Sequence, residues 1–329
     1  MFTSIKIKTN DFLGKKEYFK QRYLKKQWSA IAMSGEDDAI ETASQCPTWF
    51  SALIAGARSY FLRGEGVAGF QDLAYPMTTS LFGDLFVNQF KIGQTDAKLI
   101  PSYVPLAITE VKPLAKSVVV TYKGIGGGPD LIRLLSSGAL SCKEQALNPN
   151  GKMFETEYKL YRKVVIAVDD TDSSVKGATF NTALQLAAIL NRSSKDYRFQ
   201  RLTLSLNWPA NPAKTTNNAS SCLVFAVTPG KEDTLIQDFE RLIRKYTISK
   251  ETGMVVSKKV RSPDVLKAYS RKVKRQQVTV AEAYKAAEEA GVELIPITGE
   301  RGLIGALSVV GLVDDPEEAV TPVKLDPSE

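Results

Sequence analysis

The sequence predicts a mixed α/β (α+β) fold in which a ferredoxin-like or split βαβ sheet carries helices on one face. From residue 161 onward, β-branched apolar runs and amphipathic stretches follow one another in the order strand, helix, strand, loop, strand, helix. The first 160 residues show a less regular pattern and predict a separate N-terminal mixed α/β domain. With 329 residues and 43% hydrophobic content, the chain is long enough for each domain to have its own core.

The N-terminal domain, residues 1–160, is expected to combine a helix with several strands. Apolar residues recur at helical spacing over 46–62, after a proline near the expected helix start. The segments 78–93, 97–113 and 117–124 are expected to be extended. Nothing in these segments indicates a chemical role, so the role of this domain stays open.

The second domain, residues 161–313, contains the regular part of the pattern. The segment 147–163, which is polar and turn-rich at its start, is expected to separate it from the first domain. The predicted strands are 163–168, 201–206, 221–227 and 292–297, and the predicted helices are 178–190, 231–246 and 279–291. The last helix begins with a capping box formed by Thr279 and Glu282. Residues 314–329 form an acidic, Pro-rich tail that we expect to be poorly ordered.

The composition excludes several classes of site. The chain has no histidine, which removes the Ser-His-Asp triad, the HExxH metalloprotease and imidazole-based zinc sites. Its three cysteines, Cys46, Cys142 and Cys222, are far apart and predict neither a zinc ribbon nor a disulfide framework. No apolar run reaches 18 residues and no signal-peptide core is present, so we expect a soluble, cytoplasmic protein. Phosphoryl transfer fits the residue types that remain, because positioning and Mg²⁺ electrostatics provide most of its catalysis.

Three carboxylates follow the apolar run "VVIAV" in one short loop. Asp169, Asp170 and Asp172 stand at the end of the predicted strand, and like charges this close destabilise each other unless a cation joins them. Mg²⁺ binds one or two carboxylates together with phosphate oxygens and water. We therefore predict that these three residues hold the metal and form the catalytic group. The alternative is that they are ordinary turn and cap residues.

The residues that follow the carboxylates, and two later loops, provide candidate nucleotide contacts. The aspartate loop leads into a helix whose first backbone N–H groups attract anions. A long loop, 207–218, contains a lysine with polar neighbours, and the segment 298–311 places an arginine and glycines at a helix start. The predicted contacts are Thr171, Ser173, Gly177, Thr179, Lys214, Thr215, Asn218, Arg301 and Gly302. For the later loops the alternatives are ordinary turns and close packing at glycine.

A basic segment predicts a possible RNA partner. The chain carries a formal net charge of +7, and Lys and Arg gather between residues 241 and 275. Such a segment provides phosphate contacts, and its tyrosines could stack on bases. The alternative is a solvated helix face.

Three of these segments resemble those of a known family. "DDTDSS", "NPAKTTNNAS" and "GERGLIGALSVVG" occur in the same order in the archaeal tRNA-isoleucine agmatidine synthases, over about residues 163–313. Those enzymes use ATP and Mg²⁺ to phosphorylate the wobble cytidine of a tRNA before agmatine displaces the phosphate. The whole chain is similar to the methanogenesis marker protein 11 family, an archaeal family related to the synthases and without an established reaction.

The resemblance implies roles for the same residues. Asp169, Asp170 and Asp172 match the Mg²⁺ and phosphate aspartates, whereas Lys214 with Thr215 and Arg301 with Gly302 match the other two motifs. The synthases have Met-Cys-Thr-Thr after their glycine, whereas "ATFNT" follows Gly177 here, so their autophosphorylated threonine has no clear counterpart. The cysteine-ligated zinc ribbon of the synthases is also missing, which makes an ATP site a stronger expectation than a tRNA site.

We therefore expect an ATP- and Mg²⁺-dependent phosphotransferase or ligase-like enzyme whose acceptor is open. The alternative is a non-catalytic accessory protein that binds a nucleotide or RNA. A further alternative is an assembly factor for a methanogenic enzyme, which would require a protein partner.

Overall fold

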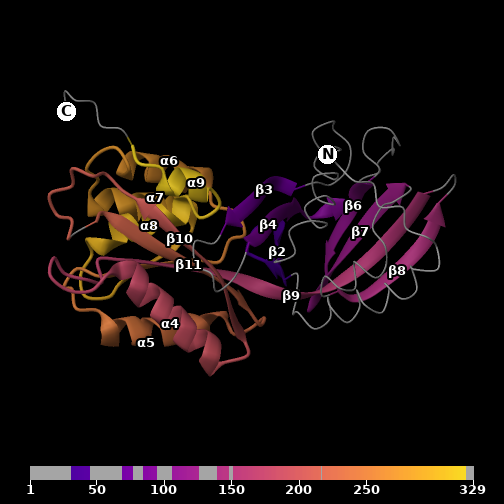
Figure 1. Cartoon of the computed structure of the whole chain (residues 1–329), viewed down its shortest axis with the longest axis horizontal. Helices are drawn as coiled ribbons and strands as arrows, with labels where there is room; N and C mark the ends of the chain where they lie inside the picture. Colours follow the sequence, from indigo (N-terminus) through magenta and orange to yellow (C-terminus); the bar gives the residue numbers. More distant parts are fainter. Residues whose placement is uncertain are drawn as a thin grey trace, which may run out of the picture. The chain divides into compact units, whose positions relative to one another are not determined.

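The computed structural model describes residues 31–44, 69–76, 84–94, 106–125, 139–147, 151–215 and 217–323 (Figure 1). The chain divides into two compact units. Unit 1 contains Met1–Ala32 and Thr42–Lys159, and unit 2 contains Met33–Glu41 and Leu160–Glu329. The helix expected over 46–62 lies outside the described residues.

The described part of unit 1 is built from antiparallel strands. They are β3 (Gly69–Pro76), β4 (Asp84–Lys91), β5 (Gly93–Gln94), β6 (Leu106–Pro113), β7 (Ser117–Ile125), β8 (Ala139–Leu147) and the first part of β9 (Gly151–Asp169). β3 pairs with β4, β6 pairs with β5 and β7, and both β7 and β8 pair with β9. The extended segments predicted from the sequence are confirmed within β4, β6 and β7. The segment 147–163, which we expected to be turn-rich at its start, continues into β9 from Gly151, and the division between the units falls inside this strand.

Unit 2 contains the ferredoxin-like sheet that the element order predicted. Its strands are the second part of β9, β10 (Tyr197–Leu206), β11 (Ala219–Val227), β12 (Gly253–Ser257) and β13 (Glu293–Pro296). They lie in the order β10-β11-β9-β12-β13, and every neighbouring pair is antiparallel. Helix α4 (Thr179–Ser193) connects β9 to β10, and α5 (Glu232–Tyr246) connects β11 to β12. Two further strands, β1 (Ile31–Ser34) and β2 (Ala39–Ser44), belong partly to this unit.

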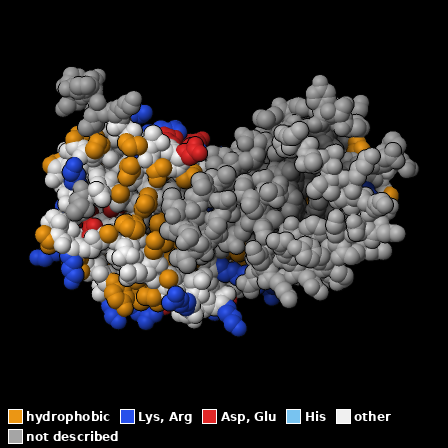
Figure 2. All heavy atoms as spheres, viewed as in Figure 1, with side chains coloured by type: hydrophobic (Ala, Val, Ile, Leu, Met, Phe, Trp, Pro, Cys, Tyr) orange, Lys and Arg blue, Asp and Glu red, His pale blue; other side chains and the backbone are white. Residues whose placement is uncertain are grey.

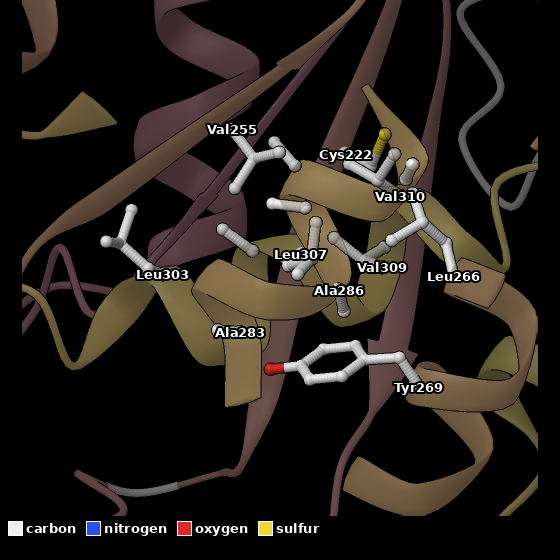
Figure 3. Close-up of a cluster of buried hydrophobic side chains, with 14 of the residues drawn as sticks. Cys222, Val255, Leu266, Tyr269, Ala283, Ala286, Leu303, Leu307, Val309 and Val310 are labelled. Atoms are coloured by element: carbon white, nitrogen blue, oxygen red, sulfur yellow. The ribbon is translucent and has the colours of Figure 1, made fainter. Parts of the chain in front are cut away.

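Helices cover both faces of this sheet, whereas we expected them on one face. Along β9, Val164, Ile166 and Val168 pack with α4 and α5, while Val165 and Ala167 face the other way. That second face is covered by α6 (Asp264–Val273), α7 (Val280–Ala290) and α8 (Gly302–Gly311) (Figures 1 and 3). The apolar run "VVIAV" is continuous because both of its faces are buried.

The start of α7 agrees with the sequence, whereas the described part of the tail, residues 314–323, differs from it. The Thr279 hydroxyl accepts the Glu282 backbone N–H, and the Glu282 side chain accepts the N–H of Thr279, which confirms the capping box of α7. The tail that we expected to be poorly ordered begins with a buried Asp314 and the helix α9 (Pro316–Val320). The ammonium group of Lys274 donates to the Ala319 carbonyl oxygen at 2.6 Å and holds this helix in place. No helix in the described ranges is long and apolar enough to cross a membrane.

Candidate nucleotide and metal site

The aspartate loop turns sharply where β9 ends. Asp170 has a φ of 52°, the only positive φ at a non-glycine residue in the described chain. Aspartate tolerates this left-handed conformation better than most residues. The hydroxyl of Thr252 donates to the Asp170 carbonyl oxygen at 2.6 Å, and Arg301 Nε donates to Asp170 Oδ2 at 2.9 Å. The turn is therefore held from its backbone and from its side chain.

A pocket of about 440 Å³ opens at this loop. Seven of the predicted site residues line it, namely Asp169, Asp170, Asp172, Thr179, Lys214, Thr215 and Asn218. Its other walls come from the start of α4, from β10 and from residues 322–323 near the C-terminus. The fold thus brings the aspartate loop and the loop 207–218 to one cavity.

One hydrogen bond joins the loop 207–218 to the aspartate loop, and two others form within the loop itself. The Thr215 hydroxyl donates to Asp172 Oδ1 at 3.1 Å, which joins this loop to the aspartate loop. The Asn218 side-chain amide donates to the Trp208 carbonyl oxygen at 2.7 Å. The Lys214 ammonium group donates to the carbonyl oxygen of Pro209 at 2.5 Å while it lines the pocket. Asn218 therefore shapes the loop, whereas Lys214 brings positive charge to the cavity.

Three other predicted contacts shape the aspartate loop without lining the pocket. Thr171 is buried, and both its backbone N–H and its hydroxyl donate to Thr179 Oγ1 at 3.2 Å. The Ser173 hydroxyl accepts the Lys176 backbone N–H at 3.2 Å, which forms a turn. Gly177 has a φ of 90°, a conformation that glycine adopts readily. At these positions the turn alternative accounts for the observed contacts.

Arg301 and Gly302 approach the aspartate loop from α8. A Cβ atom added at Gly302 would lie 2.5 Å from the Gly253 nitrogen and 2.7 Å from the Asp169 carbonyl oxygen. Its backbone N–H already donates to the Glu251 carbonyl oxygen at 2.8 Å. Gly302 therefore permits close packing, as the alternative proposed, while Arg301 supplies a charge next to Asp170.

The electrostatics of the loop favour a bound cation. Burial raises the pKa of Asp169 well above its usual value, and the negative charges of Asp170 and Asp172 raise it further. Burial also raises the pKa of Asp170, although Arg301 opposes this shift. In the part of the chain that is described, no three acidic or cysteine side chains converge closely enough to hold a metal ion alone. These residues fit Mg²⁺ that takes one or two carboxylates and fills its other positions with phosphate and water.

The start of α4 adds an anion-binding element. Its N-cap residue, Ala178, provides no side-chain hydrogen bond to the first turn. Ala178, Thr179 and Phe180 line the pocket, so the positive end of this 15-residue helix faces it. Uncapped N–H groups at a helix start bind phosphate oxygens.

Sequence reasoning missed two polar residues that support the aspartates, Ser220 and Thr252, and it treated Asn207 of the loop 207–218 as a phosphate contact rather than as a support for them. The Ser220 hydroxyl donates to Asp169 Oδ2 at 3.0 Å, and Asn207 Nδ2 donates to Ser220 Oγ at 2.6 Å. Thr252 holds the backbone of Asp170, as described above. The only signal in the sequence was the pair of serines at the start of the apolar stretch "SSCLVFAV".

Much of the basic segment 241–275 is engaged within unit 2. Arg271 pairs with Glu318 at 2.7 Å and Lys272 pairs with Glu282 at 2.5 Å. Lys274 is 3% exposed, and its ammonium group donates to the Leu206 and Ala319 carbonyl oxygens. Figure 2 shows Lys and Arg scattered over the visible face of this unit rather than gathered in one patch. The positive count of the segment therefore overstates the charge that a partner would meet.

Comparisons with known proteins relate the region that contains this site to TiaS. Residues 165–299 match the family model of the TiaS TCKD domain. The tRNA 2-agmatinylcytidine synthetase TiaS of Pyrococcus horikoshii is 30% identical over 154 residues, which cover 44% of this chain and 35% of that enzyme. A solved complex of TiaS with tRNA and ATP superposes with a TM-score of 0.42 and 22% identity, over 46% of this chain and 36% of that one. The chain thus spans about a third of the length of these TiaS proteins.

A second relative matches over a longer part of the chain. The uncharacterized protein MJ0921 of Methanocaldococcus jannaschii is 31% identical over 229 residues. The match covers 68% of this chain and 76% of that protein, so it extends well beyond the TiaS TCKD region. The chain belongs to the same family as MJ0921, and it is related to TiaS through residues 165–299, which match the TCKD domain and contain the aspartate loop.

Proposed function

We propose that unit 2 binds ATP together with Mg²⁺ and transfers a phosphoryl group to, or activates, an acceptor that is still to be identified. One observation carries the proposal: three aspartates, a lysine and an uncapped helix start line the same pocket. Carboxylates suit the metal, and the lysine and the helix start suit the phosphates. The relation to TiaS, whose name describes a synthetase acting on tRNA, supports the same class of chemistry. That the chain is a methanogenesis marker protein 11 is part of this proposal.

In this proposal each group has a separate task. Asp170 and Asp172 hold the metal, which would neutralise phosphate charge when bound. Asp169 holds the metal or orients the acceptor. Lys214 lines the pocket and Arg301 lies beside Asp170. Both cations can therefore stabilise the negative charge that develops on the transferred group.

Calorimetric titration with ATP tests the proposal directly. We expect the full-length protein to bind one ATP in the presence of MgCl₂ and to bind it more weakly in EDTA, because the carboxylates repel a metal-free triphosphate. In MgCl₂, AMP should bind more weakly than ATP, because it lacks the phosphates that the metal and the helix start would contact. An absence of heat with ATP and MgCl₂, or equal binding of ATP and AMP, would contradict the proposal.

RNA is a second candidate partner, favoured by exposed basic residues that remain after the internal pairs are counted. Lys245, Lys250 and Arg275 are exposed in the described structure. We expect Lys245→Glu with Lys250→Glu to weaken tRNA binding at least about tenfold and to reduce the salt dependence by about one unit for each lysine. Lys274 is unsuitable for such a test because it is buried. Unchanged affinity and salt dependence in a filter-binding assay would remove RNA as a partner of this surface.

A further inference from the structure

A chain of buried polar side chains connects α8 to the aspartate loop. Ser308 Oγ donates to Asn207 Oδ1 at 3.1 Å, and Asn207 Nδ2 donates to Ser220 Oγ at 2.6 Å. Ser220 Oγ in turn donates to Asp169 Oδ2 at 3.0 Å. Both serines are fully buried and Asn207 is 6% exposed. We call this chain of three residues, Ser308, Asn207 and Ser220, the relay.

The chemistry of the groups sets the direction of the relay. Ser220 donates its single hydrogen to Asp169 Oδ2, as it must when Asp169 binds a cation as an ionised carboxylate, because such a carboxylate only accepts hydrogen bonds. Ser220 then accepts from a neighbour, and the amide nitrogen of Asn207 donates to it. The amide oxygen of Asn207 is left to accept from Ser308. One amide therefore acts as donor and acceptor at once, which an ionised aspartate of the same shape could not do.

The Asp169 carboxylate is also held from two other sides. Its Oδ1 atom accepts the backbone N–H of Asp170 at 2.9 Å. A Cβ atom added at Gly305 would lie 1.8 Å from Asp169 Oδ2 and 2.5 Å from Ser220 Oγ. Glycine inside a helix is less stable than alanine, yet here only glycine leaves room for the carboxylate and its serine. Asp169 nevertheless lines the pocket, so its orientation is set from behind.

Asn207 also belongs to the second loop of the pocket. Its backbone N–H donates to the Asn218 carbonyl oxygen at 2.8 Å and closes the loop that contains Lys214 and Thr215. The same residue thus connects the aspartate loop, the lysine loop and α8. These three elements carry the groups assigned to the metal and the phosphates.

Burial alone does not explain these pairings. On β10 and β11, the strands on either side of the loop 207–218, other hydroxyls are buried and make no hydrogen bond within the described residues. They are those of Thr203, Ser205 and Ser221. Ser221 is the direct neighbour of Ser220 and is equally buried. By contrast, the hydroxyls of Ser308 and Ser220 take part in consecutive hydrogen bonds that end at Asp169, a carboxylate of the pocket.

We infer that the relay positions Asp169 for the magnesium–nucleotide complex, an inference that rests on the proposed function. Two fixed donors orient the carboxylate, and the remaining lone pairs of its oxygens serve the pocket. Ser220 and Asn207 are positioning residues because they act through Asp169. Groups that orient metal-binding carboxylates typically change metal affinity about 10- to 100-fold when they are removed.

Calorimetry on four full-length proteins tests the inference: the unchanged protein, Ser220→Ala, Asn207→Asp and the matched control Ser221→Ala. Each is titrated with ATP in MgCl₂ and again in EDTA, after a thermal melt has shown that it is folded. We expect Ser220→Ala and Asn207→Asp to weaken binding about 10- to 100-fold in MgCl₂. In EDTA, Ser220→Ala should bind ATP within about twofold of the unchanged protein, and Ser221→Ala should do so in both buffers, because neither change touches a phosphate contact.

The outcomes separate the inference from the proposed function. If the unchanged protein binds no ATP in either buffer, the proposed function is wrong and the inference is wrong with it. If the unchanged protein and Ser220→Ala bind ATP in MgCl₂ with equal affinity, only the inference is overturned. Equal losses for Ser220→Ala in MgCl₂ and in EDTA would also overturn it, because they would indicate a purely structural role. Ser220→Ala gives this answer even if Asn207→Asp does not fold.

Discussion

Replacing Glu41 by glutamine is expected to lower the free energy of unfolding of unit 2 by about 3–5 kcal/mol. The Glu41 side chain is fully buried and lies 2.6 Å from the Lys163 ammonium group and 2.5 Å from the Arg201 guanidinium group. Asp314 is the second buried carboxylate, 3.5 Å from Lys163 and 3.9 Å from Arg201. The substitution removes a negative charge that lies within 2.6 Å of each of two buried cations. The loss is a large share of the roughly 5–15 kcal/mol that typically stabilises a domain.

The same group makes stability depend on pH. Burial raises the pKa of Glu41, but Arg201 and Lys163 outweigh this effect and lower the pKa from 4.5 to about 2. Because the pKa is depressed in the folded state, the stabilisation is present above pH 4.5 and is lost as the pH falls toward 2. We expect Glu41→Gln to lose this part of the acid sensitivity.

Urea unfolding at about pH 7 and about pH 3 measures both effects. The control is Glu36→Gln, which makes the same chemical change at an exposed position of the same short segment. It should alter the free energy of unfolding by no more than about 0.5 kcal/mol. Equal stability of Glu41→Gln and Glu36→Gln at neutral pH would show that this buried charge cluster does not stabilise unit 2.

Replacing Asp170 by asparagine is expected to weaken ATP binding in MgCl₂ at least about 100-fold, which corresponds to about 3 kcal/mol. Asparagine has the same shape and also tolerates the φ of 52°, so the substitution removes charge without straining the turn. Binding of ATP in EDTA should become stronger than in the unchanged protein. The substitution removes one negative charge from the pocket and releases Arg301 from its carboxylate partner.

The opposite signs in the two buffers distinguish loss of a metal ligand from damage to the fold. Calorimetry in MgCl₂ and in EDTA measures them, with Asp264→Asn as the control because that carboxylate is 93% exposed and does not line the pocket. The control should bind ATP as the unchanged protein does. Weaker binding of Asp170→Asn in both buffers would contradict a metal-holding role for Asp170.

The candidate site illustrates how far sequence reasoning reaches. Asp169, Asp170 and Asp172 were predicted because three carboxylates after a buried strand conflict locally, and this conflict is visible in a few residues. Ser220 was not predicted, because its role comes from its hydrogen bond to Asp169. The two residues are 51 positions apart in the sequence and only folding brings them together. Lys274 was counted as a surface charge, because a lysine whose ammonium group is buried against backbone carbonyls has no distinctive local pattern.

The sequence by itself determined the features that depend on neighbouring residues. The order of strands and helices in unit 2, the capping box of α7 and the acidic strand end follow from local periodicity and turn chemistry. The tertiary structure decided that helices cover both faces of the sheet and that a relay supports Asp169. It also brought Glu41 to Lys163, which is 122 positions away in the sequence. These are properties of pairs of distant residues. The free energy of such a pair depends on the distance and burial that folding creates, and neither is written in the local pattern.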